Sequence, residues 1–263
     1  MKIIHCADLH LSSGNREYSL GVLKEIVDIA NGQKADYLLF AGDIFDSFDE
    51  IEKLSSEFKG ILGTLDEACE AFLLVGNHED LGRNKKSISS TNFGLAKENV
   101  ITFEDAPFRL IERKGLEILA IPHQKDYRGY IDWPVPTKNT GFRIALAHAS
   151  NEDLSFAGLF DDEEEKAGVM DSDLFQRFKV DYAALGHIHL ANNKTMGQVL
   201  MAYPGSARVW RKDEFGPRSL NLLECSDSIR LKKIELKSAG QFRSYHIDLG
   251  LDGKPSSEIA EQA

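Results

Sequence analysis

Side chains that can bind divalent metal ions follow five separate apolar segments, each at the point where the segment ends. They are Asp8 and His10, Asp43 and Asp46, Asn77 and His78, His148, and His187 and His189. Imidazole, carboxylate and amide ligands without a thiolate suit manganese, iron or zinc better than calcium or a structural zinc site. The residue types and their placement therefore predict a site for divalent cations.

The spacing of these residues indicates what the cations would do. In residues 8–10 and 187–189 the polar side chains are two positions apart, and alternate residues of an extended segment point to the same side. Asp43 could bridge two ions, because a carboxylate has two oxygens. Two ions about 3.5–4 Å apart can clamp a phosphate, lower the pKa of a shared water and stabilise both the attacking and the leaving oxygen. The expected chemistry is hydrolysis of a phosphate ester.

The apolar segments that precede the first three clusters are predicted to be strands joined by helices. Strands are expected at residues 2–7, 37–41 and 71–75, and apolar residues recur at helical spacing over 20–30 and 54–65. This alternation indicates an α/β fold. In such sheets ligands bind in the crevice outside the carboxyl ends of the strands, which is where the polar clusters fall.

Short strands dominate the sequence after residue 99. They are expected at residues 100–103, 108–112, 116–121, 142–147, 182–185, 199–202, 220–224, 229–236 and 242–247. A mixed sheet, or two packed sheets with helices outside, accounts for this order. Residues 1–252 are expected to form one catalytic domain, and residues 253–263 a frayed C-terminal tail.

Composition narrows the class of protein. The three cysteines form no C-x-x-C pair, which argues against a disulfide framework and fits a reducing cytoplasm. No apolar run approaches the roughly 20 residues that span a bilayer, so no membrane partner is expected. The net charge of -11 argues against coating nucleic acid by electrostatics alone. Bound cations would offset part of that charge at a carboxylate site.

The ordered motifs resemble the signature of the calcineurin-like metallophosphoesterases. The motifs are Asp8-x-His10, Gly42-Asp43-x-x-Asp46, Gly76-Asn77-His78-Glu79, His148 and Gly186-His187-x-His189. This resemblance, over residues 5–205, implies a four-layer α/β/β/α sandwich with two mixed sheets. His148 is included because the other four motifs leave one ligand missing at its place in the order. The isolated histidines His123 and His246 are not expected to bind metal.

The resemblance also implies a role for each residue. The ligands of one metal would be Asp8, His10, Asp43 and His189, and those of the other Asp43, Asn77, His148 and His187. Hydrolysis would use a metal-bound hydroxide. The expected cofactor is two Mn²⁺ ions, and Fe, Zn, Ni or Mg ions are the alternatives. His78 would bind no metal but would contact the phosphate and protonate or stabilise the leaving oxygen. Asp46 would orient His78.

The segments around these motifs resemble SbcD-type DNA repair nucleases. The resemblance lies in residues 1–11, 42–46, 202–206 and 214–218. It implies DNA as the partner and an exonuclease or endonuclease activity. The candidate phosphate contacts are Arg16, Arg83, Lys85, Lys86, Arg208, Arg211 and Lys212. Trp210 is expected either to stack on a base or to be a partly buried anchor.

Some features depart from the SbcD-type pattern and leave other functions open. An SbcC-like ATPase is considered as a partner, but we expect the segment after the catalytic residues to lack both a DNA-capping domain and the region that would bind this ATPase. Glu79 stands where aspartate is common, and no proline follows Asp46. A small-molecule phosphodiesterase or phosphomonoesterase of the same superfamily is the alternative that the net charge favours. A non-catalytic binding scaffold is a third hypothesis, although such a protein would not need every ligand residue.

Overall fold

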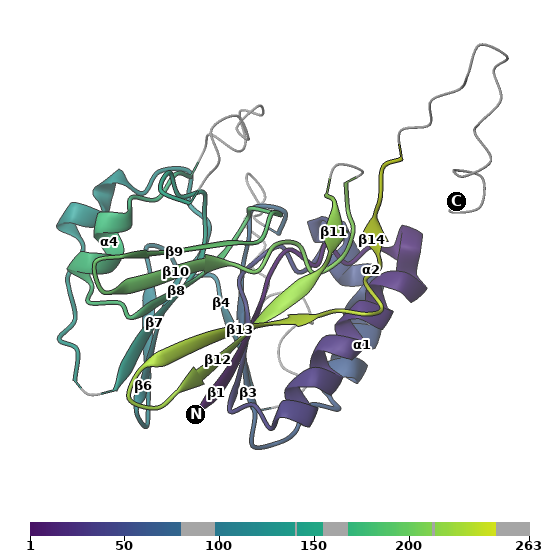
Figure 1. Cartoon of the computed structure of the whole chain (residues 1–263), viewed down its shortest axis with the longest axis horizontal. Coiled ribbons are helices and arrows are strands. Elements are labelled where there is room, and N and C mark those ends of the chain that lie inside the picture. Colours follow the sequence, from purple (N-terminus) through teal and green to yellow (C-terminus); the bar gives the residue numbers. More distant parts are fainter. Residues whose placement is uncertain (80–97, 140, 155–167, 212–213, 246–263) are drawn as a thin grey trace, which may run out of the picture.

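The computed structural model describes residues 1–79, 98–139, 141–154, 168–211 and 214–245, which contain two six-stranded sheets (Figure 1). In spatial order, the first sheet consists of β13 (Ile229–Glu235), β12 (Ser219–Cys225), β1 (Lys2–Cys6), β2 (Tyr37–Phe40), β3 (Glu70–Leu74) and β4 (Val100–Phe103). The second consists of β5 (Arg109–Arg113), β6 (Leu116–Ile121), β7 (Phe142–His148), β8 (Tyr182–Gly186), β10 (Val199–Tyr203) and β9 (Asn192–Met196). Both sheets are mixed, because antiparallel strands flank the parallel strands at one edge of the first sheet and at both edges of the second.

Helices cover the outer faces of the two sheets. Helices α1 (Arg16–Gln33) and α2 (Phe48–Leu62) share a core with the first sheet, and α4 (Ser172–Arg177) shares one with the second. A third core lies between the sheets. The layers are therefore helix, sheet, sheet and helix, as the resemblance implied (Figure 1). No helix among the described residues combines the length and hydrophobicity needed to cross a bilayer.

The alternation of side chains along the strands builds these three cores. In β2, Leu38 and Phe40 face α1 and α2, whereas Leu39 faces the second sheet. In β7, Ile144 faces the first sheet and Ala145 faces α4. Successive residues of a strand point to opposite faces, so strands that are covered on both sides must be apolar throughout. This is why the predicted strands are continuous apolar runs.

Elements with weaker apolar patterns differ from the prediction. Strand β9 was not expected, because its sequence Asn-Asn-Lys-Thr-Met is polar and it lies at a sheet edge. The short helix α4 was also missed. The expected strand at residues 242–247 is described as β14 (Gln241–Phe242), which pairs with β11 (Gly216–Pro217), and no strand continues over residues 243–245. Residues 253–263, which were expected to form a tail, lie outside the described residues.

His5 is a fully buried histidine of β1 between the two sheets. Its Nδ1 lies 2.9 Å from the hydroxyl of Tyr182 in β8. Burial lowers the pKa of His5 from 6.5 to about 3. Below pH 6.5 the unfolded chain therefore binds a proton that the folded chain excludes, so this group makes folding less favourable as the pH falls from about 6.5 towards 3.

We expect this histidine to give the metal-free protein a measurable pH dependence of stability. Each pH unit in that window costs about 1.4 kcal/mol, so about 2 kcal/mol is lost between about pH 7.5 and about pH 5. The measurement is urea unfolding of wild type and His5→Asn at both pH values. The variant is expected to be less stable at the higher pH, and its deficit should shrink by about that amount at the lower one. Parallel pH profiles of the two proteins would contradict this account.

Candidate active site

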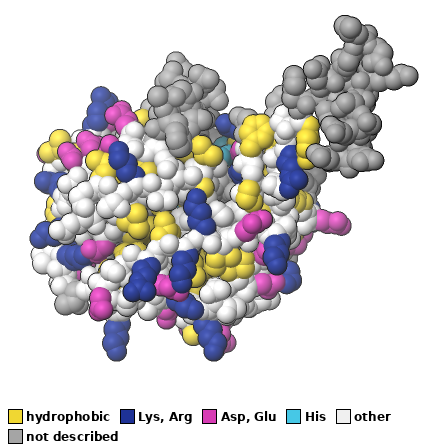
Figure 2. All heavy atoms as spheres, viewed as in Figure 1, with side chains coloured by type: hydrophobic (Ala, Val, Ile, Leu, Met, Phe, Trp, Pro, Cys, Tyr) yellow, Lys and Arg dark blue, Asp and Glu magenta, His cyan; other side chains and the backbone are white. Residues whose placement is uncertain are grey.

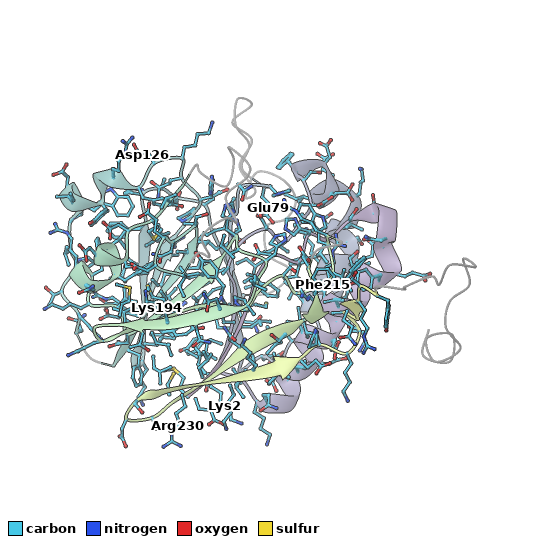
Figure 3. All side chains as sticks on the ribbon, turned by 45° about the horizontal axis from the view of Figure 1, so that its top comes forward. Lys2, Glu79, Asp126, Lys194, Phe215 and Arg230 are labelled. Carbon is cyan, nitrogen blue, oxygen red and sulfur yellow. The ribbon has the colours of Figure 1, made fainter. Side chains whose placement is uncertain are left out.

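The two sheets bring the five polar clusters of the sequence to one end of the molecule. The clusters follow β1, β2 and β3 in the first sheet and end β7 and β8 in the second, and neighbouring strands within each of these sets are parallel. Their carboxyl ends therefore share an edge. Figure 3 shows Glu79, directly after the third cluster, at this end, whereas Lys2 and Arg230 lie at the other.

The described side chains form three groups of potential ligands, two of which are neighbours that share no residue. Of these two groups, one contains Asp8, His10 and His189, and the other contains Asp43, His148 and His187. The third group, His10, Asp46 and His78, shares His10 with the first. Within each group the ligand atoms lie within 4.8 Å of one another. In the first group the Nε2 atoms of His10 and His189 are 3.1 Å apart. Two imidazole nitrogens that converge in this way suit a shared cation.

Asp43 and Asn77 complete this arrangement. Oδ2 of Asp43 lies 3.2 Å from Nε2 of His148 and 3.9 Å from Nε2 of His10, so one carboxylate stands between the two groups. Oδ1 of Asn77 lies 3.0 Å from Nε2 of His148 and 3.1 Å from Nδ1 of His187. The donor set of carboxylate, imidazole and amide oxygen fits two divalent cations that share Asp43.

Four of the converging residues have a strained backbone. Asp8, His10, Asp43 and His187 have positive φ angles of 54°, 45°, 48° and 99°. The expectation that residues 8–10 and 187–189 are extended is therefore wrong, because an extended L-residue has negative φ. Side-chain convergence arises instead from these residues in the left-handed region, while Leu9 and Ile188 are buried in the helix-facing cores as anchors. Such strain in non-glycine residues is concentrated at functional sites.

Two glycines allow the strand ends to approach closely. Gly42 has a φ of +87°, and a Cβ atom there would lie 2.2 Å from Nδ1 of His148. A Cβ atom at Gly76 would lie 2.1 Å from Oδ1 of Asp43. Any side chain at either position would displace a candidate ligand, so both strand ends require glycine.

His78 lies beside the two groups, and its orientation differs from the expectation in one respect. Its backbone N–H donates to Oδ1 of Asp43 (3.0 Å), and its Nδ1 lies 2.7 Å from the backbone oxygen of Asp46. The carboxylate of Asp46 instead faces Nδ1 of His10 at 3.5 Å. Asp46 thus orients His78 through its main chain, because the turn after β2 directs the carboxylate towards His10.

Electrostatics of the site centre on the pair Asp43 and His148. Burial opposes charge on both groups, yet their mutual attraction holds the pKa of Asp43 well below its usual range and raises the pKa of His148 to about 9. Burial lowers the pKa of His10 to about 4 and that of His187 to about 3, so both imidazoles are neutral near neutral pH. Neutral imidazole is the form that binds metal. Nδ1 of His148 lies 2.7 Å from the backbone oxygen of Ala41, which leaves Nε2 facing the site.

Two buried glutamates support the site. The carboxylate of Glu79 accepts backbone N–H groups of Asp43, Phe45 and Gly76, so it ties the turn after β2 to the turn after β3. Oε1 of Glu214 lies 2.5 Å from Nδ1 of His189. Sequence reasoning gave neither residue a role. Glu79 belongs to a quoted motif, but Glu214 is 25 residues from His189 and no local pattern connects them.

The cationic residues that were expected to contact phosphate lie in different surroundings. Arg208 is buried and donates to the backbone oxygens of Leu9 and His10, so its guanidinium supports the main chain of the first cluster. Arg16 pairs with Glu57 of α2. Arg211 lies over the ring of Trp210, with its Cζ 4.8 Å from the ring centroid. Arg83, Lys85, Lys86 and Lys212 lie outside the described residues.

His123 was not expected at the site, yet it lies beside it. Its ring centroid is 6.1 Å from those of both His148 and His187. It belongs to none of the ligand groups among the described residues. Its proximity arises from the turn after β6, whose carboxyl end is adjacent to that of β7.

A family model matches most of the chain. The model of the family described as calcineurin-like phosphoesterase matches residues 1–191, which include every residue of the two groups.

Individual relatives share only a minority of their aligned residues with this chain. The chain is 24% identical over 260 residues to an uncharacterized metallophosphoesterase, YhaO, of Bacillus subtilis, with 86% of this chain covered. It is 27% identical over 233 residues to the DNA double-strand break repair protein Mre11 of Saccharolobus solfataricus, with 81% covered. The chain spans only a little over half of these two relatives, 58% and 56% of their lengths.

Solved structures support the fold. A dimetal phosphatase from Danio rerio has a TM-score of 0.59 at 10% identity, covering 90% of this chain and 98% of that one. A protein from Thermus thermophilus has a TM-score of 0.53 at 14% identity, covering 90% and 99%. The two-sheet sandwich is therefore shared with other proteins of very different sequence.

Proposed function

The chain belongs to the calcineurin-like phosphoesterase family, and on this premise we propose that it is a phosphodiesterase that uses two divalent cations to hydrolyse DNA. The observation that carries this proposal is the position of the Asp43 carboxylate between two groups of ligands, with His78 beside them. We assign Asp8, His10, Asp43 and His189 to one cation and Asp43, Asn77, His148 and His187 to the other.

The cations, when bound, would supply positive charge for the phosphate and activate a water. The side chains of the protein would position the proton donor. His78 donates its Nδ1–H to the backbone oxygen of Asp46, which fixes the ring. When the ring is an imidazolium, Nε2 also carries a proton, which it can give to the leaving oxygen. Mn²⁺ is the preferred ion in this proposal because the donors are imidazole and oxygen without sulfur.

DNA is proposed as the substrate because the chain is similar to an Mre11 protein named for DNA double-strand break repair. The proposal does not require a partner ATPase, since this chain supplies all the assigned ligands. Cys6, Cys69 and Cys225 are free and buried, which supports a reducing compartment such as the cytoplasm.

A small-molecule phosphodiesterase or phosphomonoesterase is the second candidate, and the charge of the chain favours it. The net charge is -11, and Figure 2 shows Lys and Arg side chains interspersed with Asp and Glu on one face of the molecule. Strong nonspecific binding to DNA relies on a cationic surface. A DNA substrate would therefore have to be held mainly at the cation site.

Parallel assays separate the two candidates. Single-stranded DNA and bis-para-nitrophenyl phosphate are incubated with Mn²⁺ and equal amounts of protein. We expect both to be cleaved, and chelation by EDTA should abolish both reactions. His78→Ala serves as the control for a contaminating nuclease. Cleavage of the small ester with intact DNA would remove the nuclease proposal and leave the second candidate.

A further inference from the structure

The carboxylate of Glu214 connects a proposed metal ligand to the segment that follows β10. Its Oε1 lies 2.5 Å from Nδ1 of His189, while its Oε2 accepts the hydroxyl of Ser206 and the backbone N–H of Trp210, both at 3.0 Å. Glu214 is 8% exposed. Nη1 of Arg218 lies 3.6 Å from Oε2 and also donates to Ser206. Both oxygens of one buried carboxylate are therefore in use.

Contact with Glu214 determines which nitrogen of His189 is available to a cation. An ionised carboxylate can accept hydrogen bonds but cannot donate them. Nδ1 of His189 therefore carries the proton, which it donates to Oε1. Nε2 is then the unprotonated nitrogen, and it lies 3.1 Å from Nε2 of His10. A carboxylate behind a ligating imidazole fixes the ring and raises the basicity of the ligand.

The same carboxylate holds Trp210 against the site. Trp210 stacks on the imidazole of His10, with the ring centroids 4.1 Å apart and the planes 4° apart. It also makes edge-to-face contacts with the rings of His78 and His189, whose centroids lie 5.5 Å and 5.1 Å from that of Trp210. The anchor role considered for Trp210 thus fits its contacts, because one ring packs against three histidines of the site. Its backbone N–H is fixed by Glu214, so ring position depends on this residue as well.

We propose that Glu214 is a positioning residue for the cation assigned to Asp8, His10, Asp43 and His189. It fixes the tautomer and orientation of His189 through one oxygen, and it places the ring of Trp210 on His10 through the other. This proposal rests on the function proposed above, because it concerns the same cation site. It goes beyond that function because it makes Glu214, a residue of the 206–218 segment, responsible for positioning the ligands of one of the two cations.

The test is Mn²⁺ binding by calorimetry and by electron paramagnetic resonance in wild type, Glu214→Gln and Glu214→Ala. Wild type is expected to bind two ions with an exchange-coupled spectrum. Glu214→Ala should bind one of them about 10–100-fold more weakly and show the spectrum of isolated Mn²⁺. Glu214→Gln, which can still accept from His189 but carries no charge, should fall between them. Glu224→Ala is the matched control, since Glu224 pairs with Lys232 away from the site.

A measurement without metal tests the second half of the proposal. The chain has two tryptophans, and Trp133 packs in the outer core of the second sheet. In a Trp133→Phe background, Glu214→Gln and Glu214→Ala should shift the emission of Trp210 to longer wavelength and increase its quenching by acrylamide. Circular dichroism verifies the fold of each variant, and Glu214→Gln decides the test if Glu214→Ala does not fold.

The outcomes separate this proposal from the proposed function. A wild-type protein that binds no Mn²⁺ contradicts the cation site itself. A wild type that binds two ions, together with a folded Glu214 variant that binds both as tightly, overturns the role of Glu214 and leaves the cation site standing.

Discussion

His78→Ala is expected to lower kcat on DNA by about 10²–10⁴-fold while both cations bind as in wild type. The reason is that His78 is assigned to neither cation and its Nδ1 is bound to the backbone oxygen of Asp46, so its removal takes away the proposed proton donor and leaves the assigned ligands in place. The measurements are steady-state kinetics on a labelled oligonucleotide and metal content after dialysis.

A leaving group that needs no proton provides the control for this variant. Nitrophenolate is a stable anion, so the loss in kcat on bis-para-nitrophenyl phosphate should be much smaller than the loss on DNA. Equal losses on both substrates would assign His78 to phosphate binding and not to proton transfer. Lost cation binding with retained turnover would contradict the assignment entirely.

Asp43→Asn is expected to lose at least one bound cation and about 10³-fold or more of the activity. The carboxylate of Asp43 lies between His10 and His148, and its removal takes a negative charge from both groups at once. Shared cations contribute several kcal/mol to charge stabilisation in such reactions, and each loss of about 1.4 kcal/mol corresponds to a factor of ten. Metal content measured alongside turnover tests this expectation.

Glu235→Gln is a suitable control for the loss of one carboxylate, because Glu235 lies at the exposed end of β13 and takes no part in the site. It should retain both cations and full activity. An Asp43→Asn variant with two tightly bound ions would show that Asp43 is not shared between them.

The strands and the convergence of the polar residues that follow them were largely predictable because both depend on short sequence patterns. A strand covered on both faces is apolar throughout, so β2 and β7 were visible as continuous runs. The polar residues that follow such strands had to meet at a sheet edge, which explains why Asp8, Asp43 and His187 converge.

The remaining features depend on contacts between distant segments. The sequence could not show that Glu214 lies behind His189, or that Trp210 stacks on His10, because the loop that carries them is placed only by the folded sheets. Arg208 was misjudged for a related reason. An arginine near a site was expected to face the phosphate, whereas its guanidinium is buried under the backbone of Leu9 and His10. The left-handed backbone at Asp8 and His10 was not predicted either, because the modest preference of Asp and His for positive φ does not specify which of these residues adopt it.

The most direct test of the central claim is anomalous scattering from crystals of the protein grown with Mn²⁺. The claim predicts two neighbouring peaks, one contacting Asp8, His10 and His189 and the other contacting Asn77, His148 and His187, with Asp43 touching both. A single peak away from Asp43, or no peak among these residues at saturating Mn²⁺, would contradict it.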